Sequence, residues 1–229
     1  MRIIRNERRI NLLGSIGKYA TLAGLLTLLA SLVISFTRPE WTVPMLVSLT
    51  LGFGLSVVGG SFADRYANPL AHHATLANAL KGLDDQYTLL QYVLPASHVL
   101  LDPGGCTVFV VKAQGGEVTC QESGRWRHHQ RGKFFRQFAG QEAVGAPDYE
   151  AERQSHKLER YLAKQLPDVE VDVRAAIVFV NPDVTLDATD SPVPAFYGKK
   201  VKAWLRGPGK RKPLPADVHR QIVEALGAD

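Results

Sequence analysis

Cysteine is scarce in this sequence, because the 229 residues contain only Cys106 and Cys120. The two do not form a CxxC pair, so this common element of zinc sites is missing. We interpret both as small apolar strand residues with reduced thiols, because their part of the chain is expected in the cytosol. The sequence also lacks a large excess of charge of one sign, since the formal net charge is only +5. Such a charge permits contact with anionic lipid or nucleic acid but does not require it.

Charged residues are missing altogether from two long stretches, residues 19–37 and 41–62. Each has the length of a helix that crosses a membrane, roughly 20 residues at a rise of about 1.5 Å per residue. Together they predict a two-helix transmembrane hairpin. One alternative is a pair of buried helices in a soluble core, which should show a polar stripe that neither run has. The other is a cleaved signal peptide, although the second run would still anchor the chain.

Basic residues flank the two ends of this hairpin. The leading segment, residues 1–18, contains Arg2, Arg5, Arg8, Arg9 and Lys18. The connection between the runs offers only Arg38, whereas Arg65 and Lys81 follow the second run. The positive-inside rule therefore predicts a multi-pass protein of the cell membrane with both termini in the cytoplasm. The leading segment is interpreted either as a helix on the inner leaflet or as a simple topogenic flank.

Small residues are frequent in the second run. They are Ser48, Gly52, Gly54, Ser56, Gly59 and Gly60. Small faces let helices approach closely, so they predict packing either within the hairpin or between copies of the chain. A homo-oligomer is therefore one expected assembly.

The rest of the chain has the composition of a soluble α/β domain, with a linker at 63–72, the domain at 73–205, and a flexible basic link with a closing helix at 206–229. Helical spacing of apolar residues predicts helices near 74–87, 148–166 and 216–227. β-branched and apolar runs predict strands near 87–94, 97–101, 106–113, 117–123 and 173–180. Residues 181–194 read as a loop, and 195–205 as a helix or a strand. The order predicts a central mixed sheet.

Three strings carry a family resemblance. Residues 97–116 read "SHVLLDPGGCTVFVVKAQGG", a turn, an apolar strand that ends in lysine, and a glycine turn. Trp126 follows, then "APDYEAERQSHKLERYL" at 146–162 and "AAIVFV" at 175–180. In this order they resemble the nuclease-related domain (NERD) family over residues 71–180. That family is similar to the restriction-endonuclease-like PD-(D/E)xK superfamily, so the resemblance implies the same fold here.

The resemblance also implies which positions would perform hydrolysis. A Mg²⁺ ion wants carboxylate ligands to hold it against a phosphate, and a lysine beside the attacking water completes the set. In this sequence the lysine is Lys112, but Val110 stands where the strand glutamate is expected and Ser97 where the strand-start aspartate is expected. The glutamine of the later helix falls at Glu150, and the glutamate of the first helix falls near His72 or His73. Of the catalytic residues that the resemblance implies, this sequence therefore keeps only the lysine, Lys112.

Two acids near this strand are the candidates for a rearranged metal site. Asp102 and Glu117 stand in the expected turns on either side of the strand. We expect no cofactor, and Mg²⁺ only if such a rearranged nuclease exists. Lys112 is otherwise interpreted as a solvated lysine at a strand end or as a vestigial phosphate contact.

Basic residues with interleaved aromatics form the other candidate surface. They are Arg125, Arg127, Arg131, Lys133 and Arg136 beside Trp126, Phe134 and Phe135, and later Lys199, Lys200 and Lys202. Nucleic acid, anionic lipid and plain solvent are the three expected environments for such a surface.

The leading hypothesis is a membrane-anchored, non-catalytic NERD-like binding or scaffold module. The alternatives are a metal-dependent nuclease with a rearranged site and a structural membrane protein with a basic, lipid-facing surface.

Overall fold

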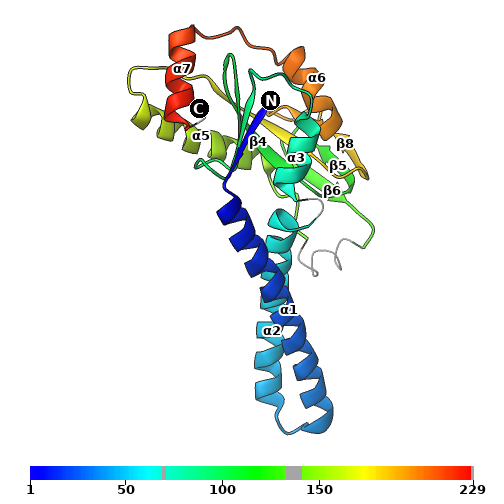
Figure 1. The fold of residues 1–229 in the computed structure, drawn as a ribbon. Coiled ribbons are helices and arrows are strands. Elements are labelled where there is room, and N and C mark those ends of the chain that lie inside the picture. The colour runs from blue at the N-terminus through cyan, green and yellow to red at the C-terminus, as the bar shows by residue number, and fades with distance from the viewer. Residues whose placement is uncertain (69–70, 133–140, 228–229) are drawn as a thin grey trace. The chain divides into compact units, whose positions relative to one another are not determined.

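The computed structural model describes residues 1–68, 71–132 and 141–227, and the chain divides into two compact units. One unit holds residues 7–71 and 131–143, and the other holds residues 1–6, 72–130 and 144–229. Figure 1 traces both units from the N-terminus in blue to the C-terminus in red. Each unit is described by itself below.

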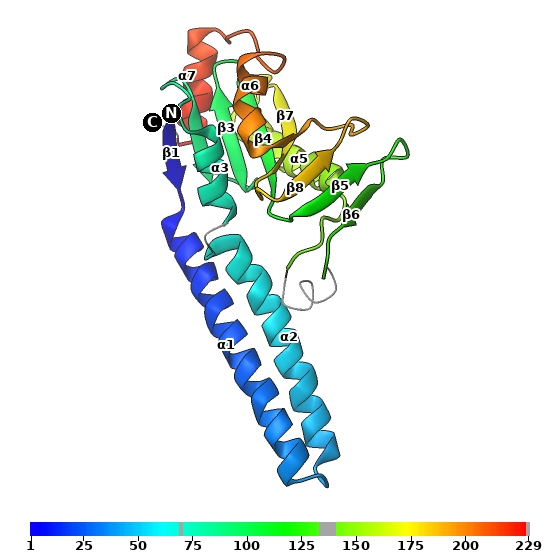
Figure 2. The same cartoon turned by 90° about the vertical axis from the view of Figure 1, so that its right-hand side faces the viewer.

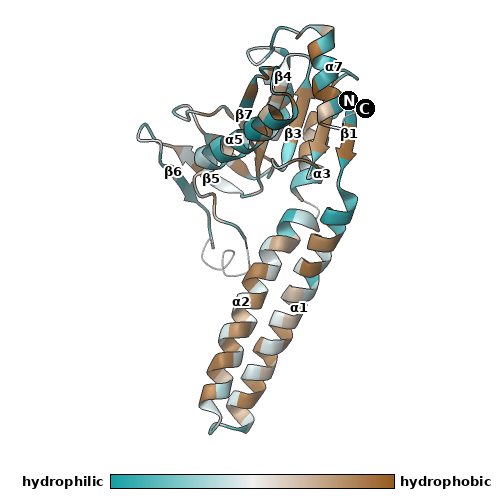
Figure 3. Cartoon of the chain, turned by 90° about the vertical axis from the view of Figure 1, so that its left-hand side faces the viewer, coloured by the Kyte–Doolittle hydropathy of each residue, from teal (hydrophilic) through white to brown (hydrophobic). Residues whose placement is uncertain are grey.

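The first unit is an antiparallel pair of helices, α1 (Glu7–Thr37) and α2 (Thr42–Tyr66) (Figures 1 and 2). Both are long and apolar enough to cross a membrane. Figure 3 shows apolar residues around both helices, and large side chains such as Leu22, Leu29 and Val47 are more than half exposed. Helices from the core of a soluble protein would bury such side chains. The two apolar runs predicted from the sequence are therefore confirmed as candidate membrane spans.

Glycine contacts hold the two helices together. A Cβ at Gly17 would lie 2.5 Å from the backbone nitrogen of Ala63, and a Cβ at Gly59 would overlap the backbone of Thr21. Farther along the pair, the hydroxyls of Ser31 and Ser48 lie 2.5 Å apart. Ser48 and Gly59 of α2 thus serve packing within the hairpin, which was one of the two interpretations of that pattern.

Gly54 behaves differently from Gly59, because a Cβ there would meet nothing within 4 Å. We expect Gly59→Leu to separate the helices, since its side chain would have to occupy the space of the Thr21 backbone. Gly54→Leu is the matched control and should be tolerated. With cysteines at positions 31 and 48, oxidation in membranes should cross-link the parent and the Gly54→Leu variant well, and the Gly59→Leu variant severalfold less. Equal cross-linking in all three would contradict the helix contact.

The second unit is built around a mixed sheet of six strands in the order β1-β2-β3-β4-β7-β9. Their bounds are β1 Arg2–Arg5, β2 Thr88–Gln91, β3 His98–Asp102, β4 Gly105–Lys112, β7 Val173–Phe179 and β9 Ala195–Tyr197. β3 pairs antiparallel with both of its neighbours, β2 and β4. The other three pairs, β1 with β2, β4 with β7 and β7 with β9, are parallel. This arrangement confirms the expected mixed sheet, with β4 fully buried near its centre.

A small second sheet has the order β6-β5-β8, with β5 at Gly116–Cys120, β6 at Trp126–His129 and β8 at Val184–Asp187. The sequence analysis predicted β5, but it gave no strand for β6 and predicted a loop over β8. Both strands are four residues long and alternate between half-buried and exposed side chains. Such short, half-polar strands carry little sequence signal.

Helices cover both faces of the six-stranded sheet. Their bounds are α3 His72–Leu80, α5 Pro147–Gln165, α6 Val201–Arg206 (after the 3₁₀ turn η1, Gly198–Lys200) and α7 Ala216–Ala225. Leu76 of α3 and Leu205 of α6 share an apolar cluster with Phe109 of β4. On the opposite face, Leu158 of α5 and Ile222 of α7 pack with other residues of the sheet. A third apolar cluster joins α5 and β4 to the small sheet.

The first residues of the chain are a correction to the sequence analysis. Arg2–Arg5 form β1, a parallel edge partner of β2, and Ile4 packs against an apolar cluster of the sheet. The segment expected to lie as a helix on the inner leaflet therefore begins as a strand. The arginines from Arg8 onward belong to α1, which is continuous from Glu7. Ile3 and Ile4 belong to the sheet. In the sequence their distance from the apolar residues of α1 matches a helical repeat, which is why the whole segment was interpreted as a helix.

Candidate nuclease-like site at the end of β4

β4 presents alternate side chains to the two layers of helices. Val108 and Val110 lie in apolar clusters with α5, whereas Phe109 and Val111 lie in the cluster with α3 and α6. Since residues two apart in a strand point to the same face, Lys112 shares the α5 face with Val110. The spacing that the resemblance requires for a strand acid and its lysine is therefore present.

Lys112 is buried, with a relative exposure of 7%. Its Nζ lies 2.8 Å from Oε2 of Glu150, in the first turn of α5. Gln154, one turn later, donates from Nε2 to the other Glu150 oxygen at 3.1 Å, and its Oε1 accepts the backbone N–H of Ser97 at 3.0 Å. The interpretation of Lys112 as a solvated strand-end residue is wrong, because the lysine ends a buried polar chain that runs through Glu150 and Gln154 to Ser97.

The two positions that would need acids lie on β4 and just before β3. The antiparallel register of β3 and β4 ends with Val99 opposite Val108, and Ser97 precedes β3; an extension of this register by two residues would put Ser97 opposite Val110. Val110 is 1% exposed and belongs to an apolar cluster with Ala151 and Ile177. An apolar side chain therefore occupies the position where the resemblance expects the strand carboxylate.

Neither rescue candidate approaches this position. Asp102 pairs with Gly105 at the start of β4, seven residues from Lys112, which is roughly 23 Å along a strand. Glu117 lies within β5 rather than in a turn, and it is exposed, whereas its neighbour Val118 packs with Val110. Successive strand side chains point to opposite faces, so Glu117 points away from the cluster. The positions of Asp102 and Glu117 therefore exclude both acids as replacement metal ligands beside Lys112.

Glu150 and Gln154 are the site residues that sequence reasoning did not select. The resemblance pointed to position 150, but as a substituted glutamine and not as the partner of Lys112. Helical spacing places residues 150 and 154 on one face of α5, one turn apart. That spacing was readable in the sequence, whereas their pairing with a lysine on β4 depends on how α5 packs against the sheet.

A buried aromatic pair lies beside Ser97. The rings of His98 and Tyr92 are 4.8 Å apart in an edge-to-face arrangement, and the Tyr92 N–H donates to the Ser97 carbonyl at 2.8 Å. Tyr92 has φ of +59°, a left-handed backbone conformation that is uncommon for a residue with a side chain. His98 is 2% exposed, so it is a packed residue of the sheet. These contacts fix the backbone that presents Ser97 to Gln154.

The first basic segment keeps only part of its predicted surface. Arg125 and Arg127 are exposed on one face of the β6 hairpin, and Arg131 is exposed after it. Trp126 points the other way, with its ring centroid 6.0 Å from that of Phe179. The half-buried Trp126 ring therefore packs against the third apolar cluster and does not lie among the exposed arginines, where it could stack on a nucleic-acid base. Lys133 and Arg136, with Phe134 and Phe135, lie outside the described residues.

The second basic segment lies around η1 and α6. Lys199 and Lys200 are exposed, whereas Lys202 is half-buried and donates from Nζ to the Lys81 carbonyl at 2.7 Å. Lys202 is thus occupied by an internal contact, which leaves Lys199 and Lys200 as the candidates for an anionic partner.

Neither the geometry of the described residues nor the comparisons with known proteins identify a metal site or a family. Among the residues that the structure describes, no three histidine, cysteine, aspartate or glutamate side chains gather closely enough to hold a metal ion. No family model matches the chain, and neither a curated protein nor a solved structure matches it. The architecture established for this chain is therefore a mixed α/β domain that accompanies two candidate membrane spans.

Proposed function

We propose that this protein is a membrane-anchored binding module with a nuclease-related frame, in which an internal ion pair has replaced the metal site. The observation that carries the proposal is the environment of β4. Val110 is buried among apolar side chains, and Lys112 is engaged by Glu150 at 2.8 Å. A lysine held in a buried pair is not available to a phosphate or to an attacking water.

The order of elements supports the nuclease-related frame. α3, β2, β3 and β4 follow one another as a helix and three antiparallel strands, and after the small-sheet strands β5 and β6 come the helix α5 and the strand β7. This is the order on which the resemblance to the NERD family and the restriction-endonuclease-like fold rests. α5 lies on the connection between β4 and its parallel neighbour β7, directly before β7, and its first turn supplies the partner of Lys112.

The pairing of β1 supports a particular topology. β1 precedes α1 and β2 follows α2, yet the two strands are hydrogen-bonded neighbours. A hairpin of two spans returns the chain to the side from which it started, so the N-terminus and the α/β domain share one side of the membrane. The arginine-rich start of α1 supports the cytoplasm as this side of the membrane.

Full-length protein in phosphatidylcholine nanodiscs should show no Mg²⁺- or Mn²⁺-dependent cleavage of plasmid DNA or single-stranded RNA. The reason is that Mg²⁺ gives up its water reluctantly and gains little from a site with no strand carboxylate. The Lys112→Ala variant, purified in the same way, is the control that separates the protein's own activity from that of a contaminating nuclease.

Metal-dependent cleavage by the wild type that Lys112→Ala abolishes would overturn the non-catalytic proposal. It would favour the rearranged nuclease, with Glu150 as the first candidate ligand. Cleavage that is the same in both preparations would be assigned to a contaminant and would leave no activity attributable to Lys112.

A further inference from the structure

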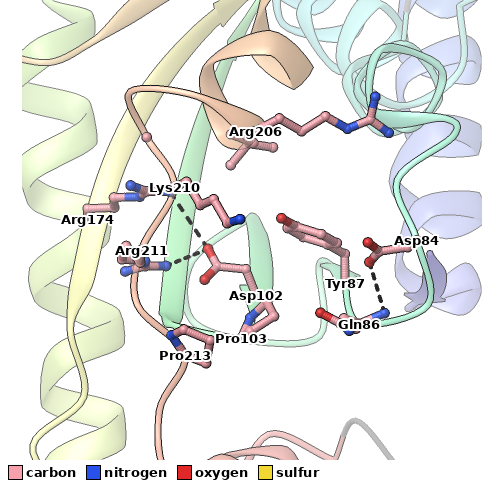
Figure 4. Close-up of a pocket in the computed structure, with 12 residues that line it drawn as sticks. Asp84, Gln86, Tyr87, Asp102, Pro103, Arg174, Arg206, Lys210, Arg211 and Pro213 are labelled. Carbon is pink, nitrogen blue, oxygen red and sulfur yellow. Dashed lines mark hydrogen bonds and ion pairs between the residues drawn. The ribbon is translucent and has the colours of Figure 1, made fainter.

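A charged cavity lies on the α3 and α6 face of the sheet, at the end of β4 opposite Lys112. It has a volume of about 330 Å³. The residues that matter for its chemistry are Tyr87, Asp102, Arg174, Arg206, Lys210 and Arg211. Figure 4 shows them directly before β2, at the end of β3, in β7, at the end of α6 and in the segment that follows α6. The volume is at the lower end of the range for sites that bind small molecules, which is about 300–1,000 Å³.

The wall formed by residues 207–213 is docked and not a free link. The Gly209 N–H donates to the Trp204 carbonyl at 2.8 Å, and a Cβ at Gly209 would lie 2.5 Å from the Trp204 ring. The Leu214 N–H donates to the Pro103 carbonyl at 2.8 Å. The sequence analysis expected a flexible basic segment here, and the glycine contact explains the difference, because only glycine lets the chain lie on the tryptophan.

Positive charge exceeds negative charge in this cavity. Its lining has four cationic side chains and two carboxylates, Asp84 and Asp102. Asp102 is 4% exposed, and it accepts hydrogen bonds from Arg211 Nη2 at 2.7 Å and from the Gly104 N–H at 2.8 Å. Asp102 is therefore hydrogen-bonded to Arg211 and to the β3–β4 turn, and the two carboxylates together leave an excess of two positive charges in the lining.

Arg174 is held in place, but its only ion pair among the described residues is a long one, to Asp102. Its Nε donates to Thr107 Oγ1 at 3.0 Å, and its guanidinium lies 4.3 Å from the centre of the Trp204 ring. Its Nη2 is 3.7 Å from Asp102 Oδ2, which is too far for a hydrogen bond. Burial, and then the positive charge of Arg211, lower the pKa of Arg174. An anion in the cavity would relieve this repulsion and accept the remaining Nη donors.

Tyr87 and Lys210 supply further hydrogen-bond donors to the cavity that Arg174 lines. Figure 4 shows the Tyr87 hydroxyl and the Lys210 ammonium directed toward each other across the cavity. Burial, and then the charges of Asp102 and Asp84, raise the pKa of Tyr87, so its hydroxyl stays protonated and can donate. Arg206 sits at the rim, where its Nη2 donates to the Gly82 carbonyl at 2.7 Å.

We propose that this cavity binds a phosphoryl group of a small ligand, through Arg174, Lys210 and Tyr87. A phosphate monoester brings up to two negative charges and three terminal oxygens, which suits a guanidinium fork, an ammonium and a hydroxyl around one point. The site is separate from the Lys112 region and does not depend on the nuclease-related proposal. The phosphoryl group has two possible sources, a soluble phosphate ester or the headgroup of an anionic lipid.

The test is protection of Lys210 from acetylation, followed residue by residue by mass spectrometry in full-length protein. Lys212 is the matched internal control, because it is exposed two residues away and does not line the cavity. In phosphatidylcholine nanodiscs, the soluble probe is glycerol 3-phosphate. In a parallel arm the nanodiscs contain phosphatidic acid and the solution contains no phosphate.

Slower acetylation of Lys210, with Lys212 unchanged, is expected in at least one arm, and the arm that gives it identifies the source. Tyr87→Phe should weaken the protection by at least about tenfold in probe concentration, because it removes a hydrogen bond to a charged group. The Lys212→Ala variant should retain full protection of Lys210. Absence of protection in both arms, equal protection of both lysines, or full protection in Tyr87→Phe would overturn the proposal.

Discussion

Val110→Glu should destabilise the α/β domain by about 3–5 kcal/mol, the usual range for a buried charge without a partner. Val110 is 1% exposed on the central strand and packs against Ala151 of α5. The nearest cation on the same face is Lys112, whose ammonium is already paired with Glu150 at 2.8 Å. The new carboxylate would therefore have to be buried unpaired or to break an existing pair.

Unfolding of this domain can be followed by pulse alkylation of Cys106 in urea. Cys106 is a free, buried thiol on β4, and burial raises its pKa to about 12, so it should react only when the strand is exposed. The matched control is Val110→Gln, which has the size of glutamate without its charge and should cost about 1–3 kcal/mol. Equal losses for glutamate and glutamine would show that size, and not charge, determines the effect.

A second acid turns the same variant into a test of the nuclease-related frame. Ser97 falls opposite Val110 when the β3–β4 register is extended, so Ser97→Asp with Val110→Glu would bring two carboxylates together near Lys112. We expect Mg²⁺ to raise the stability of the double variant and not of either single variant, because one carboxylate is a poor Mg²⁺ site. A double variant that does not respond to Mg²⁺ would contradict the convergence of these two positions.

The fold was readable from the sequence wherever one strong local pattern decided the structure. Uncharged runs predicted α1 and α2, and helical spacing between Asp148 and Leu166 predicted α5, which the structure places at Pro147–Gln165. β1 was missed because arginines next to a membrane span have a topogenic explanation of their own. Its role depends on a pairing with β2, more than 80 residues away, which no local pattern reports.

The candidate site was readable only in part, for a related reason. The strand alternation of Val110 and Lys112 was sufficient to put both side chains on one face. The identity of the partner of Lys112 was not readable, because it depends on the packing of α5 against β4. Asp102 shows the same limit, since an aspartate before "PGG" is typical of an exposed turn, whereas its main partner Arg211 lies 109 residues later.

Asp102→Ala should also destabilise the domain by about 3–5 kcal/mol. The Asp102 carboxylate is the only acid that contacts both Arg211, at 2.7 Å, and Arg174, at 3.7 Å, within the described residues. Burial alone would lower the pKa of Arg211, but hydrogen bonding to Asp102 and its charge outweigh burial, and the pKa is raised. Removal of the carboxylate leaves two guanidinium groups that repel each other in a partly buried place.

Asp172→Ala is the matched control, because Asp172 contacts the same guanidinium at 2.9 Å but its side chain is 63% exposed. An exposed ion pair contributes about 0–1 kcal/mol to the free energy of unfolding. We therefore expect Asp172→Ala to cost much less stability than Asp102→Ala, because the two pairs differ in burial and not in distance. In a double-mutant cycle, Asp102→Ala with Arg211→Ala should cost less than the sum of the single changes, since each single change leaves the other charge without its partner. Pulse alkylation of Cys106 measures the stability of the wild type and of all four variants. Additive losses, or equal losses for Asp102→Ala and Asp172→Ala, would show that the buried pair does not hold the segment after α6 against the sheet.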